Sequence, residues 1–370
     1  MKKTSFVIVV ATLVSWGSAS SQTVEVPFDS DQWETKGANY VLQKYEGRDG
    51  ILLQAGTIYL KDVAFLDGTI EVDINFSALR NFPGIGWRMV DPENHEHFYI
   101  RPHQSGNADA NQYTPVFNGL AGWQLYHGEQ YATPIHYTFN EWHHVRIEVA
   151  GNQAKIFFDD MDKPLLEVKE LLRSPQAGTL SLNTRTNVHF ANFKYTPAPT
   201  SAPTTAPSPG ALRPVPDGLI TSWQLSDKLN TKTFQEKNTM TSTDLKEVRW
   251  AQRNVESSGV LNIGRYTKLE RDHNSVLVKL DIQADSKQIK QLVFGYSDLV
   301  KVFINGQAVY SGSNVFGSRD YRYLGTIGYF DSIYLPLRKG KNEVIFLVTE
   351  NFGGWGLQAI LKDRKGIHLP

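Results

Sequence analysis

The chain of 370 residues contains no cysteine. Disulfide bonds, thiolate metal sites, a cysteine nucleophile and a lipid-modified cysteine are therefore excluded. Charge of one sign is not in excess either, because 38 basic residues balance 38 acidic ones, and this argues against nucleic acid as a partner. The sequence also has no Gly-x-Ser-x-Gly elbow, no phosphate-binding glycine loop and no dinucleotide fingerprint. The sequence thus has no motif of the serine hydrolases with a nucleophile elbow, of the P-loop nucleotide-binding enzymes or of the dinucleotide-dependent enzymes.

Long apolar runs are confined to the N-terminus. Lys2 and Lys3 precede an apolar stretch from Phe6 to Val14, and small residues follow from Gly17 to Ser20. This layout predicts a secretory signal peptide over residues 1–20, with a buried N-terminal strand as the alternative. No other run approaches the roughly 20 apolar residues that a membrane helix needs. We therefore expect a secreted or periplasmic protein with no membrane insertion; its oligomeric state stays open.

Proline is concentrated in one segment. Residues 197–216 read PAPTSAPTTAPSPGALRPVP, with seven prolines among 20 residues. Such a stretch cannot bury enough apolar surface to order itself, so it predicts a linker between one unit at residues 23–196 and another at 217–370. The first unit has 14 basic and 22 acidic residues and the second has 21 and 16. Their net charges are therefore −8 and +5.

Alternating apolar residues indicate strands throughout the first unit. From Gly68 to Phe76 every second residue is apolar, which is the period of a strand with one buried face. Residues 165–172 are the one helix that we expect. The pattern predicts an all-β chain of two antiparallel β-sandwich (jelly-roll) domains joined by the Pro/Thr/Ala-rich linker. Further strands of the first unit, two pairs of them in hairpins, are predicted at residues 85–90, 97–101, 143–149, 154–158, 178–182 and 188–195.

Two stretches of the first unit carry a family resemblance. Residues 139–147 (FNEWHHVRI), followed by 154–160 (AKIFFDD), and the closing strands 178–182 and 188–195 resemble concanavalin A-like lectin/glucanase jelly rolls. That superfamily includes laminin G-like modules, legume lectins, laminarinase-type glycosidases and 3-keto-disaccharide hydrolase-like domains. The resemblance implies a jelly-roll fold for most of residues 24–195, and it implies little about activity because the fold hosts many functions.

An enzymatic hypothesis depends on Glu71 and Asp73. Laminarinase-type glycosidases carry a Glu-x-Asp-x-(x)-Glu strand, and this chain matches the first two acids but has Asn75 and Phe76 where the third belongs. Retaining hydrolysis needs a nucleophile and a general acid about 5 Å apart. If the first unit is an enzyme, Glu71 and Asp73 are its candidate catalytic residues; otherwise they are acids on the solvent face of a strand.

A second face offers residue types suited to sugars. His97, Tyr99 and Arg101 alternate with apolar residues, so we expect them to share the non-core face with outward side chains. Arg88 lies in the facing strand, and a glycine-rich aromatic segment spans residues 118–127. Rings stack on the C–H faces of sugars, and polar side chains bond their hydroxyls. The alternative is that the aromatic residues of residues 118–127 pack in the core. The predicted ligand-binding set is Arg88, His97, Tyr99, Arg101, Trp123, Gln124 and Tyr126.

A weak metal signal lies after the strand at residues 154–158. Asp159, Asp160 and Asp162 form a carboxylate cluster, and calcium favours oxygen ligands in turns. The spacing is not that of a calcium loop, and aspartate is common in turns for backbone reasons. We therefore expect no cofactor, with calcium at these three residues as the alternative.

The second unit also reads as a β-sandwich. Asn305-Gly306 joins two strand-like segments and predicts a two-residue hairpin turn. Residues 302–307 (VFINGQ) and 335–344 (LPLRKGKNEV) resemble the galactose-binding-like jelly roll, a module appended to many glycan enzymes. The resemblance implies ligand binding by loops at one end, with Tyr323, Tyr329 and Trp355 as candidates. The alternative is a sandwich that only supports the first unit.

Taken together, these patterns predict an exported carbohydrate-binding protein. Its first unit would recognise a poly- or oligosaccharide, and the second would be an accessory sandwich. One alternative is a glycoside hydrolase or a 3-keto-glycoside-processing enzyme built on the first unit. Another is an adhesion or scaffold module that binds protein. A groove that gathers the predicted residues would favour carbohydrate binding, and a carboxylate pair inside that groove would favour the enzyme.

Overall fold

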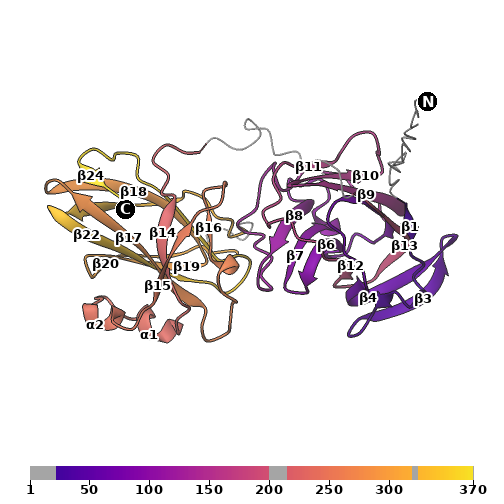
Figure 1. The fold of residues 1–370 in the computed structure, drawn as a ribbon, viewed down its shortest axis with the longest axis horizontal. Coiled ribbons are helices and arrows are strands. Elements are labelled where there is room, and N and C mark those ends of the chain that lie inside the picture. Colours follow the sequence, from indigo (N-terminus) through magenta and orange to yellow (C-terminus); the bar gives the residue numbers. More distant parts are fainter. Residues whose placement is uncertain (1–21, 200–214, 319–323, 370) are drawn as a thin grey trace, which may run out of the picture.

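The structure of the chain, a computed structural model, describes residues 22–199, 215–318 and 324–369. The fold is nearly all β and forms two β-rich units side by side (Figure 1), so the all-β prediction is confirmed. The predicted signal peptide, most of the predicted linker and Tyr323 lie outside the described residues. Among the described residues, no helix is long and apolar enough to cross a membrane.

The first unit is a sandwich of two antiparallel sheets. Its strands are β1 (Val24–Glu25), β2 (Trp33–Glu34), β3 (Asn39–Tyr45), β4 (Arg48–Leu60), β5 (Gly68–Asn75), β6 (Gly84–Asp91), β7 (Asn94–Ile100), β8 (Asn111–Val116), β9 (Trp142–Ala150), β10 (Gln153–Phe158), β11 (Leu166–Val168), β12 (Thr179–Thr184) and β13 (Val188–Pro197), with a 3-10 turn, η1 (Pro102–Gln104). One sheet has the order β11-β10-β9-β5-β13-β4, and the other has the order β4-β12-β6-β7-β8. Strand β1 pairs with β13, and β2 and β3 pair with β4.

Strand β4 belongs to both sheets. Its residues 50–53 pair with β13, and its residues 56–59 pair with β12. Gly56 stands at the change with a φ of 105°, where an added Cβ would also meet the backbone of Ala38. Glycine is therefore required where this strand passes from one sheet to the other.

The alternation predicted for β5 is present, since Ile70, Val72 and Ile74 are buried in the core between the two sheets. The two predicted hairpins are confirmed as the antiparallel pairs β6–β7 and β9–β10. The helix expected at residues 165–172 is wrong. Leu166 and Val168 are buried and Glu167 between them is exposed, so this segment has the period of a strand, and it forms β11 against β10.

The second unit has a seven-stranded sheet packed on a four-stranded one. The larger sheet has the order β15-β14-β17-β22-β19-β20 with β24 on β17, and the smaller has the order β16-β23-β18-β21. Asn305 and Gly306 both have positive φ, as the predicted hairpin turn requires. The elements are β14 (Ser222–Ser226), α1 (Thr231–Gln235), α2 (Ser242–Leu245), β15 (Trp250–Asn254), β16 (Leu261–Asn262), η2 (Ile263–Arg265), β17 (Ser275–Ala284), β18 (Gln288–Ser297), β19 (Leu299–Ile304), β20 (Gln307–Ser313), β21 (Asp331–Leu337), β22 (Gly340–Thr349), β23 (Gly356–Ile360) and β24 (Ile367–His368).

The two units pack against each other. Leu125 of the first unit lies in one buried apolar cluster with Val260 and Ile327 of the second. Polar contacts cross the same boundary, among them a hydrogen bond of 2.8 Å from Asn118 Nδ2 to the carbonyl of Gly264. Loops of the second unit thereby lie beside the β6-β7-β8 end of the first (Figure 1).

Candidate functional site

A groove lies on the outer face of the β12-β6-β7-β8 sheet. It encloses about 410 Å³, within the size range of small-ligand sites. Strand β7 and the residue just after it supply the floor, and the segment before β6 and the end of β12 supply one rim. The second unit closes the opposite end with Phe316, Leu324 and Phe352. The groove is therefore built by both units.

The predicted row of His97, Tyr99 and Arg101 forms the floor of this groove. The rings of His97 and Tyr99 stack with centroids 5.3 Å apart. His97 Nε2 donates to Asn183 Oδ1 at 2.8 Å, and burial lowers the pKa of the His97 imidazole to about 4. His97 is therefore a neutral hydrogen-bonding group at physiological pH, held by Asn183 of β12 and by stacking on Tyr99.

Arg101 differs from the expectation of an outward side chain with free donors. It is only 6% exposed, and its guanidinium donates to the Tyr99 hydroxyl at 2.7 Å, to the Asp109 carbonyl at 2.7 Å and to Gln112 Oε1. The strand alternation predicted the groove face correctly for Arg101, but neighbouring acceptors already use most of the N–H groups of its guanidinium. Arg101 therefore holds the groove floor together, and its truncation would disturb the fold as well as the site.

Aromatic rings form the wall at the far end. The Trp123 ring meets Phe316 at 6.4 Å and Phe352 at 5.7 Å between centroids, both edge to face. Phe316 and Phe352 are 48% and 55% exposed, so part of each ring is open to a ligand in the groove. An apolar wall above a polar floor suits a ligand that has both C–H faces and hydroxyl groups.

The opposite rim is cationic. Arg80 precedes β6 and Arg185 follows β12, and their guanidinium carbons lie 5.5 and 5.0 Å from the Phe82 ring centroid. Both arginines are exposed. Among the described residues that line the groove, Asp109 is the one carboxylate. A pair of carboxylates is therefore not part of the described lining.

Three predicted ligand residues lie elsewhere. Arg88 is buried, with a φ of 49°, in a bulge that interrupts the β6–β7 register. Its guanidinium donates to the Leu66 and Gly151 carbonyls and pairs with Asp67. The bulge breaks the alternation on which its placement depended. Gln124 and Tyr126 are fully buried where the two units meet.

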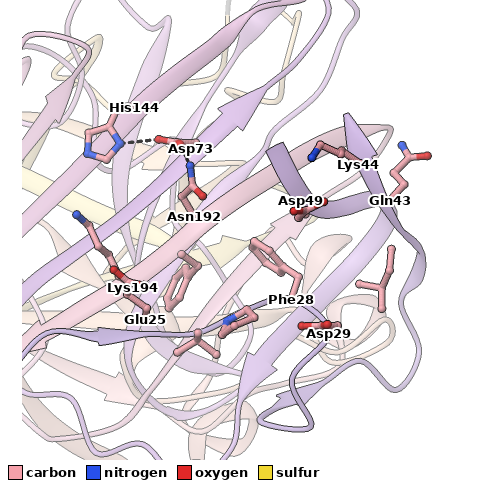
Figure 2. A pocket seen from close by; sticks show the side chains of 15 residues that line it. Glu25, Phe28, Asp29, Gln43, Lys44, Asp49, Asp73, His144, Asn192 and Lys194 are labelled. Carbon is pink, nitrogen blue, oxygen red and sulfur yellow. Dashed lines mark hydrogen bonds and ion pairs between the residues drawn. The ribbon is translucent and has the colours of Figure 1, made fainter. Parts of the chain in front are cut away.

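The acidic pair Glu71 and Asp73 lies on the outer face of the other sheet. His144 bridges the two acids, with Nδ1 2.6 Å from Asp73 Oδ1 and Nε2 3.0 Å from Glu71 Oε2. Arg48 pairs with Asp73 at 2.5 Å, and Lys194 pairs with Glu71 at 3.2 Å. Figure 2 shows Asp73 between His144 and Asn192, with Lys194 nearby. Asp73 and His144 line a separate hollow of about 710 Å³, and neither acid lines the aromatic groove.

The surroundings of Asp73 favour its anion. Burial would raise the pKa of Asp73, but hydrogen bonds from His144 and Asn192 outweigh it and lower that pKa. The hydrogen bond to Asp73 raises the pKa of His144, and each ring nitrogen of His144 lies within hydrogen-bond distance of a carboxylate oxygen. A retaining hydrolase needs one carboxyl group that stays protonated, and the surroundings of Asp73 oppose this role.

The second-unit candidates are not grouped in one place. Trp355 is fully buried in the core of the second unit and donates from Nε1 to the Val348 carbonyl at 3.3 Å. Tyr329 is half-buried and does not line the groove, and Tyr323 lies outside the described residues. Near Trp355 in the sequence, it is Phe352 that reaches the groove.

The aspartates proposed for calcium serve the backbone instead. Asp159 Oδ2 meets His143 Nδ1 at 2.7 Å, and its Oδ1 accepts from the His144 amide. Asp160 Oδ1 accepts the amides of Asp162 and Lys163. Within the described part of the chain, no group of three or more His, Cys, Asp or Glu side chains is placed to hold a metal.

Comparison with known proteins gives likeness of fold only. No family model matches the chain, and no curated protein matches it. Solved structures that resemble it include the carbohydrate binding module CBM66 from Bacillus subtilis (18% identity, 44% of this chain and 94% of that chain, TM-score 0.34). Another is a glycosyl hydrolase family protein from Mycobacterium fortuitum (14% identity, 47% of this chain and 98% of that chain, TM-score 0.33). A third is the Bacillus licheniformis beta-glucanase (10% identity, 48% of this chain and 98% of that chain, TM-score 0.34).

Proposed function

We propose that this chain is an exported carbohydrate-binding protein that holds its ligand in the groove between its two units. The observation that carries the proposal is the pairing of an aromatic wall, Trp123, Phe316 and Phe352, with a hydrogen-bonding floor that includes His97. Sugars present apolar C–H faces and polar edges to such surfaces. The second unit takes part in binding because it supplies part of that wall.

The hydrolase alternative is less well supported. Catalysis on a glycosidic bond uses two carboxyl groups facing the same bond, and the described lining of the groove offers Asp109 alone. Glu71 and Asp73 are near each other but lie on the other sheet. For the scaffold alternative, the groove would be a protein contact, and the ligand screen below separates the two ideas.

The test is a glycan array with the full mature chain, followed by calorimetry on each hit. Phe352→Ala removes an exposed ring from the groove, and Tyr334→Ala, 68% exposed on β21, removes an exposed ring outside it. We expect Phe352→Ala to weaken binding about tenfold, since a stacked ring contributes about 1 kcal/mol or more, and Tyr334→Ala to bind like the wild type. Equal binding by all three proteins would place the site elsewhere, and release of sugar products would show an enzyme.

Export has its own test. We expect the mature chain to begin near Ser20 or Ser21, because the small residues before that point suit signal peptidase. N-terminal sequencing of protein recovered outside the cytoplasm measures this directly. An intact Met1 on that protein would contradict it.

A further inference from the structure

The cationic rim of the groove is held in place by a buried asparagine. Asn81 Oδ1 accepts the backbone amides of Phe82, Arg185 and Thr186, at 2.8, 3.1 and 3.2 Å. Its Nδ2 donates to the Thr186 carbonyl at 3.1 Å. One side chain therefore joins the segment before β6 to the loop after β12, and both segments bring an arginine, Arg80 and Arg185, over the Phe82 ring.

These two arginines have no counter-ion within the described part of the chain. Among the described residues, neither guanidinium has a hydrogen bond or an ion pair, whereas Arg88 and Arg101 use theirs internally. Their contact with the Phe82 ring limits their rotamers without satisfying their donors. Five N–H groups on each side chain stay available to a ligand.

The positive rim contrasts with the unit that carries it. Residues 23–196 have eight more acidic than basic residues, yet the described lining of the groove has three arginines and one aspartate. The positive charge also acts on His103, which lines the same groove. Burial lowers the pKa of His103, and the charges of Arg80 and Arg101 lower it further. On an acidic surface, a local cationic rim beside an aromatic wall attracts anionic ligands selectively.

We propose that the groove selects glycans that carry carboxylate or sulfate groups, with Arg80 and Arg185 pairing with those groups while the aromatic wall receives the sugar ring. This inference rests on the proposed carbohydrate-binding function and adds the ligand class. A guanidinium pairs with a carboxylate or a sulfate through parallel hydrogen bonds, which are stronger than bonds to neutral hydroxyls. A neutral glycan would leave both guanidinium groups without an anion.

The experiment compares matched ligands on the full mature chain by calorimetry. The ligands are polygalacturonate against its methyl ester, and dextran sulfate against dextran. We expect each anionic member to bind about tenfold tighter or more, the usual advantage of one charge-assisted hydrogen bond. Preference within the first pair alone identifies a uronate as the source of the anion, and preference within the second alone identifies a sulfate.

Charge variants then locate the effect. Arg80→Gln/Arg185→Gln removes two positive charges at the rim, and Arg249→Gln/Arg271→Gln removes two exposed charges from the second unit. We expect the rim variant alone to lose the preference, with melting temperatures unchanged because both side chains are exposed. Equal affinity for the charged and neutral members, or an equal loss in the control variant, overturns the inference. In that case Phe352→Ala still decides the proposed function, which fails separately if no glycan binding depends on that ring.

Discussion

The hydroxyl of Tyr126 joins the two units, and its removal tests whether they form one body. Tyr126 belongs to the first unit and is fully buried. Its hydroxyl donates to the Glu256 carboxylate at 2.8 Å and accepts from Asn262 Nδ2 at 2.7 Å. Glu256 also pairs with Arg265, within the second unit. Tyr126→Phe deletes this one oxygen and keeps the ring that packs on Tyr131, 5.5 Å away.

The expected loss follows from the two contacts. A hydrogen bond to a charged group contributes about 1.5–3 kcal/mol, and a buried donor left without a partner, here the Asn262 amide, costs about 1–3 kcal/mol. Because both effects arise from one hydroxyl, we expect its removal to weaken the free energy of association of the two units by about 3 kcal/mol. That corresponds to a change of about a hundredfold in an equilibrium constant.

The assay uses a protease site inserted between residues 200 and 214. After cleavage, the two halves of the wild type should stay together on gel filtration, and their dissociation constant can be measured. Tyr126→Phe should raise it about a hundredfold. Tyr137→Phe is the matched control, since its hydroxyl bonds to the Ala110 carbonyl inside the first unit, and it should leave the constant unchanged. Halves that separate in the wild type, or a Tyr126→Phe protein with unchanged affinity, would refute the interface.

Three further predictions concern pH and the loop beside the groove. Burial raises the pKa of Glu96 to about 7 from its ordinary 4.5, so the folded chain binds more protons in that window and its stability falls as pH rises from about 4.5 to 7. Glu96→Gln should weaken the pH dependence of the free energy of unfolding, measured by urea titration between about pH 5 and 8. An unchanged pH dependence in this variant would assign the effect to other groups. His144 should titrate above pH 6.5 by NMR, because its hydrogen bond to Asp73 raises its pKa, and Asp73→Asn should lower that value; a wild-type value below 6.5 contradicts the bridge. Gly353→Ala should weaken both the interface and glycan binding, because φ is 108° there and an added Cβ would meet the Gln124 side chain; normal binding by this variant would show that the loop can shift.

Local pattern was sufficient for the strands. The two-residue period of β5 and the turn at Asn305-Gly306 depend only on neighbours in sequence, which is why both are confirmed. The wrong helix prediction at residues 165–172 arose because local pattern was not sufficient there. A short apolar segment has no clear period of its own, and its pairing with β10 decides its conformation.

Part of the lining of the groove was predictable for an equally physical reason. Alternation along β7 places His97, Tyr99 and Arg101 on one face from sequence alone, and the structure has all three in the groove. Alternation does not say which sheet a strand joins. The sequence therefore left open whether Glu71 and Asp73 share a groove with these residues, and the structure places their strand in the opposite sheet.

Composition and periodicity determined the all-β class, the placement of most strands and the face of β7, because each depends on residues close together in the chain. Tertiary structure alone decided which side chains meet across long distances in sequence. Phe352 and Trp123 are 229 positions apart and share one wall. Arg80 and Arg185 both lie over the Phe82 ring, and Gln124 is buried against a unit that begins beyond the predicted linker. Such contacts arise from the packing of one unit on another, and no local sequence pattern encodes that packing.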